Sequence, residues 1–239
     1  MEYASSTLSL EVAGHVATLW LDRPEKMNAI SHQMWGDFVT AMDAVAADDS
    51  IRVVILAGRG KSFCVGLDLS VLSGGPDVSS ATGCLEQLGH TLRCRRGLTA
   101  IANCPVPVIA AIHSHCLGGG VDLATACDIR LASADATFGV RETRIGIVAD
   151  AGTLQRLPSV VSAGHVAELA YTGRDISAAR AEKIGLLNDV YPDVDSLYAA
   201  ARKLAEEIAA NAPLAVRGTK FILQQGDDLS TCLLYTSPS

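Results

Sequence analysis

Aromatic side chains and positive charges are both scarce in this chain of 239 residues. Phe, Trp and Tyr make up 5% of the sequence, and 26 Asp and Glu outnumber 19 Lys and Arg, which gives a formal net charge of −7. This acidic balance argues against a nucleic-acid-binding protein, because such proteins usually carry a basic surface. With 49% apolar residues the chain can build one sizeable core, and its many small residues suit close packing of helices on a sheet.

Long apolar runs and paired cysteine motifs are also missing. The longest uncharged stretch, 97–121, contains Pro105, Pro107, two histidines and a run of glycines, so we expect no membrane span. The seven cysteines include no CxxC pair and are interpreted as reduced thiols. The start of the chain is polar and shows no signal peptide. Together these features predict a cytoplasmic protein.

Strand and helix patterns alternate along the chain and predict an α/β fold. Apolar, β-rich runs predict strands over 15–21, 52–57, 106–112, 128–132 and 137–140. Apolar residues at helical spacing predict helices over 31–47, 81–103, 121–126, 162–171, 177–184 and 196–211. We expect Ser31 to cap the first helix, the Gly/Ser/Pro-rich segment 72–80 to be mobile, and 113–120 to form a turn.

The strongest local feature is a run of three glycines, Gly118 to Gly120, between a buried strand and a short helix. Glycine allows close backbone approach, and a helix N-terminus presents unpaired N–H groups. The run therefore predicts a site for a developing oxyanion, although a purely structural tight turn fits the spacing equally well. A second glycine turn surrounds Gly66, where Asp68 is interpreted as a helix cap rather than a catalyst.

Three acidic residues are candidates for proton transfer. Asp122 follows the glycine run, and Glu142 and Asp150 flank an apolar segment. Asp150 stands between Val-Ala and Ala-Gly, so we expect it to be buried. Carboxylates that share an apolar pocket have raised pKa values that differ from one another. One of them can then accept a proton while another donates one. The alternative is that nearby arginines at 141, 144 and 156 neutralise these acids in salt bridges.

Metal and thiol chemistry have weaker support. His113, His115 and Cys116 lie close together, but a zinc site needs more ligands in defined spacing, so no metal is expected. Cys116 lacks a base that the sequence would orient toward it. The GxGxxG, GxxxxGK[ST] and GxSxG patterns of dinucleotide, nucleotide and serine-hydrolase sites are absent.

The glycine turns and acids, taken with their neighbouring motifs, resemble the enoyl-CoA hydratase/isomerase (crotonase) superfamily over residues 8–220. The matching motifs are LDRPEKMNAI, RVVILAGRGKSFCVGLDL, PVPVIAAIHSHCLGGGVDLATACDIRLAS, ATFGVRETRIGIVADAGTLQRLP and NAPLAVRGTK. The resemblance implies a spiral of ββα units over residues 1–195 and a C-terminal helical region over 196–239. The chain has LSTCLLYTSPS where the family continues its last helices, so we expect this region to be truncated.

The resemblance also implies an acyl-coenzyme A substrate and assembly into trimers or hexamers. Backbone N–H groups of Leu67 and Gly119 correspond to the donors that hold the thioester oxygen. Coenzyme A is part of the substrate, and no separate cofactor is expected. Residues matching its binding path are Lys26, Met27, Val65, Gly66, Asp68 and Gly118.

The set Asp122, Glu142 and Asp150 resembles that of Δ3,5-Δ2,4-dienoyl-CoA isomerases, because hydratases have glycine at the position of Asp150. This implies that conjugated double bonds move from the 3,5 to the 2,4 positions through a dienolate, in fatty-acid β-oxidation. Glu142 is expected to act at C2 and Asp150 at C6, with Asp122 orienting the site. The alternatives are enoyl-CoA hydration, another crotonase activity, or an inactive acyl-CoA-binding subunit.

Overall fold

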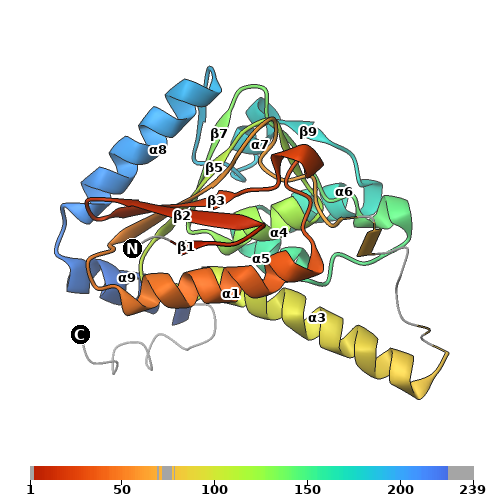
Figure 1. Ribbon diagram of the computed structural model, residues 1–239. Helices are drawn as coiled ribbons and strands as arrows, with labels where there is room; N and C mark the ends of the chain where they lie inside the picture. Colours follow the sequence, from red (N-terminus) through yellow and green to blue (C-terminus); the bar gives the residue numbers. More distant parts are fainter. Residues whose placement is uncertain (1–2, 69, 72–76, 78, 226–239) are drawn as a thin grey trace.

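A twisted sheet of seven strands forms the centre of the computed structural model, which describes residues 3–68, 70, 71, 77 and 79–225 (Figure 1). The first three strands are antiparallel, and the others continue the sheet in parallel. Their order is β1 (Tyr3–Ala4), β2 (Leu8–Ala13), β3 (Val16–Leu21), β4 (Val53–Gly58), β5 (Val108–Ile112), β7 (Ile129–Ser133) and β10 (Asp189–Tyr191). Every residue of β4 and β5 is buried, as predicted for central parallel strands.

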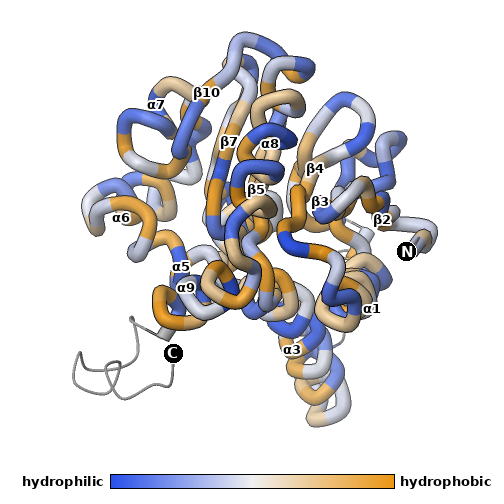
Figure 2. Tube along the Cα trace, turned by 90° about the vertical axis from the view of Figure 1, so that its left-hand side faces the viewer, coloured by the Kyte–Doolittle hydropathy of each residue, from blue (hydrophilic) through white to orange (hydrophobic). Residues whose placement is uncertain are grey.

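Helices cover both faces of this sheet, which confirms the α/β class. Val53 and Ile55 of β4 pack against α8, whereas Val54 and Leu56 belong to the larger core on the other face. Figure 2, in which α8 faces the viewer, shows hydrophilic residues on this helix, whose apolar residues pack on the sheet. The helices are α1 (His32–Ala47), α3 (Ala81–Ala102), α4 (Gly119–Ala126), α5 (Thr153–Val160), α6 (Ala163–Thr172), α7 (Ala178–Lys183), α8 (Val194–Ala209) and α9 (Pro213–Gln225).

A smaller sheet consists of β6 (His115–Leu117), β8 (Thr137–Gly139) and β9 (Ile176–Ser177) in the part of the chain that the structure describes. Strand β6 pairs in parallel with β8, which pairs antiparallel with β9. The prediction of a turn over 113–120 is therefore wrong at its centre, because residues 115–117 pair with residues 137–139, about 22 positions later, and so form a strand. Helix α4 also begins at Gly119, earlier than predicted.

Helices α1 and α3 lie side by side beneath the sheet in Figure 1. The predicted cap is confirmed, since the Ser31 hydroxyl accepts a hydrogen bond of 3.3 Å from the Met34 N–H. Glycine at position 97 permits close approach of the two helices. A β-carbon placed on Gly97 would lie 2.8 Å from the Trp35 carbonyl oxygen.

The remaining predictions vary in outcome. The other predicted helices occur within three residues of their expected bounds, whereas β1, β2, β9, β10 and α5 were not predicted. Helix α9 lies in the C-terminal helical region that the resemblance implies. Among the described residues, two short 3₁₀ helices also occur, η1 (Pro24–Lys26) and η2 (Glu142–Ile145). Most of segment 72–80 and the tail 229–239 lie outside the described residues. The division of the chain at residue 195 remains a prediction. No helix in the described ranges is long and apolar enough to cross a bilayer.

Two glycines of α3 give a test of this packing. Gly97→Ala should destabilise the protein by about 1–3 kcal/mol, because the new methyl group meets the backbone of α1. Gly89→Ala in the same helix meets nothing within 4 Å and should stabilise the protein by about 0.5–1 kcal/mol through helix propensity. Urea denaturation measures both effects. Equal stability of the Gly97→Ala variant and the parent would show that α1 and α3 do not approach as described.

Candidate active site

The two predicted glycine turns lie side by side because their flanking segments pair through the backbone. Cys64 and Cys116 form an isolated parallel bridge. The Cys64 N–H donates to the His115 carbonyl at 2.9 Å, and the Leu117 N–H donates to the Cys64 carbonyl at 3.0 Å. Segments that are about 50 residues apart in sequence are thereby fixed immediately before both turns.

Both turns require glycine. Gly66 has φ +96°, and a β-carbon on it would lie 2.8 Å from the Leu117 carbonyl oxygen and 3.4 Å from the Gly119 nitrogen. Gly118 has φ +51°, and its N–H donates to the Gly139 carbonyl at 2.8 Å. Side chains at these positions would be strained and would push the turns apart.

The predicted donors, the N–H groups of Leu67 and Gly119, are brought together. Their proximity is clear because a β-carbon on Gly119 would lie 3.7 Å from the Leu67 nitrogen. Ile30 fixes the peptides on either side of Leu67 by donating to Gly66 and accepting from Asp68. Neither donor has an acceptor within the described chain. Gly119 begins α4, so its N–H also lies at the positive end of a helix dipole.

Two cavities meet at these donors. The first, of about 680 Å³, lies between helices α1 and α3 and the segment 147–151. The second, of about 560 Å³, runs along residues 65–68 and the segment 141–147. A ligand that spans both cavities would pass the two free N–H groups. The residues shared by the two linings are Leu67, Gly119, Glu142 and Ile147.

Asp122 lies in the first turn of α4 and is buried. One of its carboxylate oxygens accepts hydrogen bonds from the Thr153 N–H at 2.5 Å and from the Thr153 hydroxyl at 2.8 Å. Burial raises the pKa of Asp122 to about 6, despite these two bonds. Asp122 is therefore a fixed carboxyl group at the base of the first cavity.

Glu142 begins η2 and is 9% exposed. Its Oε2 atom is buried and has no hydrogen-bond partner within the described chain. Burial raises the pKa of Glu142 to about 7, and the negative charge of Asp122 contributes to the rise. A carboxyl group with this pKa can gain or lose a proton near neutral pH.

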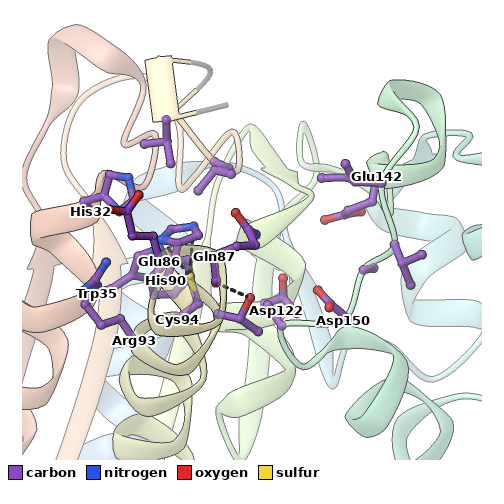
Figure 3. Close-up of a pocket in the computed structure, with 18 residues that line it drawn as sticks. His32, Trp35, Glu86, Gln87, His90, Arg93, Cys94, Asp122, Glu142 and Asp150 are labelled. Carbon is purple, nitrogen blue, oxygen red and sulfur yellow. Dashed lines mark hydrogen bonds between the residues drawn. The ribbon is translucent and has the colours of Figure 1, made fainter. Parts of the chain in front are cut away.

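Asp150 lines the first cavity but is exposed, so the expectation that it is buried is wrong. Its apolar neighbours in sequence do not enclose it: Val148 is 65% exposed, and the segment 147–151 forms the open edge of the cavity. Figure 3 shows the carboxyl group of Asp150 beside that of Asp122, with Glu142 facing both. The structure thus brings all three predicted acids to one cavity.

The alternative of neutralising salt bridges is not realised. Arg141 pairs with Asp175, and among the described residues no arginine forms an ion pair with Asp122, Glu142 or Asp150. Arg156 lies near Asp122 without a direct contact and lowers the pKa of that carboxyl group, a smaller effect than burial.

The predicted coenzyme A residues divide into two groups. Four of them, Val65, Gly66, Asp68 and Gly118, line the second cavity, whereas Lys26 and Met27 line neither. Asp68 also pairs with Arg23 at 3.1 Å and accepts a hydrogen bond from the Ser70 N–H, which supports its interpretation as a local structural cap.

The histidines and cysteine beside the glycine run form no reactive centre. The His113 side chain is buried against the Gly60 carbonyl and the Tyr198 hydroxyl. Burial raises the pKa of the Cys116 thiol well above its usual value, which disfavours the nucleophilic thiolate. Within the described ranges, no three His, Cys, Asp or Glu side chains form a group that could hold a metal ion.

Sequence reasoning missed the wall of the first cavity that α1 and α3 provide. The α3 residues recur at helical spacing, but nothing in their pattern marked this face as the one turned toward the acids. The residues of this wall are His32, Trp35, Glu86, Gln87, His90, Thr91, Arg93 and Cys94.

The raised pKa of Glu142 predicts a pH-dependent stability. Between its ordinary pKa of 4.5 and about 7, the folded protein binds more protons than the unfolded chain, so this group lowers stability as pH rises. Glu142→Gln should therefore be more stable than the parent by about 1–3 kcal/mol at pH 8, and the difference should vanish near pH 4.5. Urea titrations across this range, with exposed Glu207→Gln as the control, measure the effect. A difference that does not depend on pH would contradict it.

Comparisons with known proteins agree with this geometry. The family model described as enoyl-CoA hydratase/isomerase matches residues 11–231. A mitochondrial Delta(3,5)-Delta(2,4)-dienoyl-CoA isomerase of Dictyostelium discoideum is 45% identical over 217 residues, covering 89% of this chain and 74% of the relative. Its peroxisomal counterpart from Arabidopsis thaliana is 42% identical over 217 residues, covering 89% of this chain and 78% of the relative. A chain from Thermobifida fusca, solved in complex with CoA, superimposes with a TM-score of 0.86 at 29% identity, covering 96% of this chain and 89% of that one.

These relatives correct one expectation. The prediction of a cytoplasmic protein is contradicted, because the two related isomerases are named mitochondrial and peroxisomal. Scattered reduced thiols do not distinguish the cytosol from other reducing compartments. The matches extend over most of the chain and agree with the predicted fold. The chain belongs to the enoyl-CoA hydratase/isomerase family and has the crotonase fold.

Proposed function

We propose that the protein is an isomerase that converts 3,5-dienoyl-CoA to 2,4-dienoyl-CoA in fatty-acid β-oxidation. The observation that carries this proposal is the meeting of three acids, Asp122, Glu142 and Asp150, at one cavity beside two free backbone N–H groups. The relatives named as Delta(3,5)-Delta(2,4)-dienoyl-CoA isomerases, at 45% and 42% identity, support it.

The first step removes a proton from C2 of the substrate. Glu142 suits this step because it lines both cavities together with the two N–H donors, and C2 is bonded to the thioester carbon that these donors would hold. As the C2–H bond breaks, its electron pair becomes delocalised over the diene and the thioester oxygen. The N–H groups of Leu67 and Gly119 would stabilise that oxygen as its negative charge develops.

The second step adds a proton at C6, four bonds away from C2. Asp150 suits this step because it lines only the first cavity, farther along the acyl chain than the donors. The C3–C4 and C5–C6 double bonds become C2–C3 and C4–C5 double bonds, and the negative charge leaves the thioester oxygen. After each turnover Glu142 carries the proton from C2 and Asp150 lacks one. Glu142, with a pKa of about 7, can release its proton near neutral pH, and water can return a proton to the exposed Asp150. Asp122, held by Thr153, orients the site and raises the pKa of Glu142, which makes the Glu142 carboxylate a stronger base for the C2 proton.

The remaining predictions belong to the same proposal. Val65, Gly66, Asp68 and Gly118 would contact the coenzyme A portion in the second cavity, with Lys26 and Met27 beyond it. The proton transfers use only side chains of the chain and need no cofactor. Self-association into trimers or hexamers is supported by apolar side chains of α9 that are exposed in the single chain, Leu214, Phe221 and Leu223.

Conversion of a 3,5-dienoyl-CoA to the conjugated 2,4 form, followed by ultraviolet absorbance, tests the proposal directly. Glu142→Gln and Asp150→Asn should each lower kcat by about 100-fold or more, and the double variant should lose less than the product of the two, because the acids act as a unit. Glu207→Gln changes an exposed acid that lines neither cavity, and should leave kcat unchanged as the control. Crotonyl-CoA hydration at a comparable rate would favour a hydratase, and CoA-ester binding without turnover would favour an inactive subunit.

The first glycine turn offers a second test. The Cys64 thiol, which is fully buried, accepts a hydrogen bond of 3.4 Å from the Gly66 N–H and so fixes the Val65–Gly66 peptide, next to the peptide that carries the Leu67 donor. Burial raises the pKa of Cys64 to about 12, so the sulfur adds no negative charge beside the oxyanion site. Cys64→Ala should lower kcat by about 10-fold with little change in KM, because one donor loses its support.

Two further variants make this test specific. Cys64→Ser keeps an acceptor and should recover most of the lost kcat. Cys104→Ala removes another buried thiol, outside both cavities, and should lower stability without the same loss of kcat. Equal kcat in the Cys64→Ala variant and the parent would show that the thiol does not support the donor.

A further inference from the structure

The first cavity has one wall that is unexpectedly polar for a hydrocarbon chain. The segment 147–151 provides mainly apolar side chains, as a fatty acyl group would require. The opposite wall, formed by α1 and α3, is mostly polar, and Figure 3 shows its labelled side chains across the cavity from the acids. The polar residues of this wall are His32, Glu86, Gln87, His90, Thr91 and Arg93.

This wall lies away from the coenzyme A side of the site. None of the residues that line the second cavity comes from α1 or α3. A substrate whose thioester oxygen reaches Leu67 and Gly119, and whose coenzyme A portion occupies the second cavity, therefore directs the end of its acyl chain toward this wall. The polar wall would contact the distal part of the acyl group rather than its reacting carbons.

The centre of the wall is a pair of histidines. The rings of His32 and His90 meet edge to face, with centroids 4.4 Å apart. His90 also lies 3.6 Å from the Cys94 sulfur through its Nε2 atom. These contacts hold the His90 ring at the cavity surface, half-buried, where its nitrogen atoms can bond to a ligand.

Arg93 adds a positive charge to the same wall. It forms no ion pair with any residue that the structure describes, although Glu86 stands two turns earlier on the same helix. Burial lowers the pKa of His90, and the positive charges of His32 and Arg93 lower it further. An anion bound between the two side chains would relieve this effect, because it would attract both the guanidinium group and a protonated imidazole.

We infer that the polar wall selects dienoyl-CoA substrates whose acyl chain carries an oxygen acceptor at its distal end, a terminal carboxylate above all. This inference rests on the proposed function and names its substrate class. A methyl end against this wall would displace water from His90 and Arg93 without forming a hydrogen bond to either side chain. A carboxylate end would accept charge-assisted hydrogen bonds from both, whereas a hydroxyl end would form weaker hydrogen bonds without a negative charge.

The test compares 3,5-dienoyl-CoA substrates of matched length that end in a methyl, a hydroxyl or a carboxylate group. The carboxylate-ended substrate should have a kcat/KM about 10- to 100-fold above that of the methyl-ended one at its best chain length. His90→Leu and Arg93→Gln should each remove most of this preference. Arg96→Gln changes an exposed arginine of the same helix that lines neither cavity, and should preserve it.

One further variant and one binding measurement separate recognition by the polar wall from other causes of the same result. His90→Gln retains a hydrogen-bond donor and should keep part of the preference, which separates recognition from a packing defect. Calorimetric binding of saturated acyl-CoA esters with the same three ends tests the wall without catalysis, so failure of the isomerase proposal would be seen separately, as binding without turnover. Equal or tighter binding of the methyl-ended ester by the parent protein, or a preference that survives in the His90→Leu variant, would overturn the inference.

Discussion

The backbone bridge between Cys64 and Cys116 is the constraint on which the whole site depends. It joins two segments that are remote in sequence and aligns the glycine turns that follow them. The bridge and its flanking hydrogen bonds involve only main-chain atoms. The positions of the two N–H donors therefore do not depend on any catalytic side chain. Strain-free turns at Gly66 and Gly118 then let the donors approach each other. Donors held in this way need little reorganisation when charge develops on a ligand oxygen.

The three acids differ in how deeply they are buried, and this difference suits each of them to a separate role. Asp122 is buried and bound by Thr153, Glu142 is buried with a free oxygen, and Asp150 stands at the exposed edge of the cavity. A buried carboxyl group beside another negative charge has a raised pKa, about 7 for Glu142, so its carboxylate can take up a proton and release it again near neutral pH. The exposed one can exchange protons with water. This separation suits a reaction in which a proton leaves one carbon and another arrives four bonds away.

Local patterns in the sequence predicted much of this arrangement. Helix α1 followed from its apolar spacing and Ser31, and glycine turns after buried strands indicated an oxyanion site. The resemblance to the family then identified Leu67 and Gly119 as the donors. Predictions from the sequence were wrong where contacts between distant segments determine the burial or secondary structure of a residue. Asp150 is exposed because its apolar neighbours form an open cavity edge, and β6 exists because β8 pairs with it. The polar wall was missed since helical spacing at His90 does not reveal which face meets the acids.

The most direct test of the dienolate account is proton exchange at C2, followed by NMR in deuterated water. With Asp150→Asn, the account predicts that Glu142 still removes and returns the C2 proton. Deuterium should therefore enter C2 of the 3,5-dienoyl-CoA while the double bonds stay in place. Glu142→Gln should abolish this exchange. Exchange at C2 that persists without Glu142, or isomerisation by Asp150→Asn at the parent rate, would contradict the account.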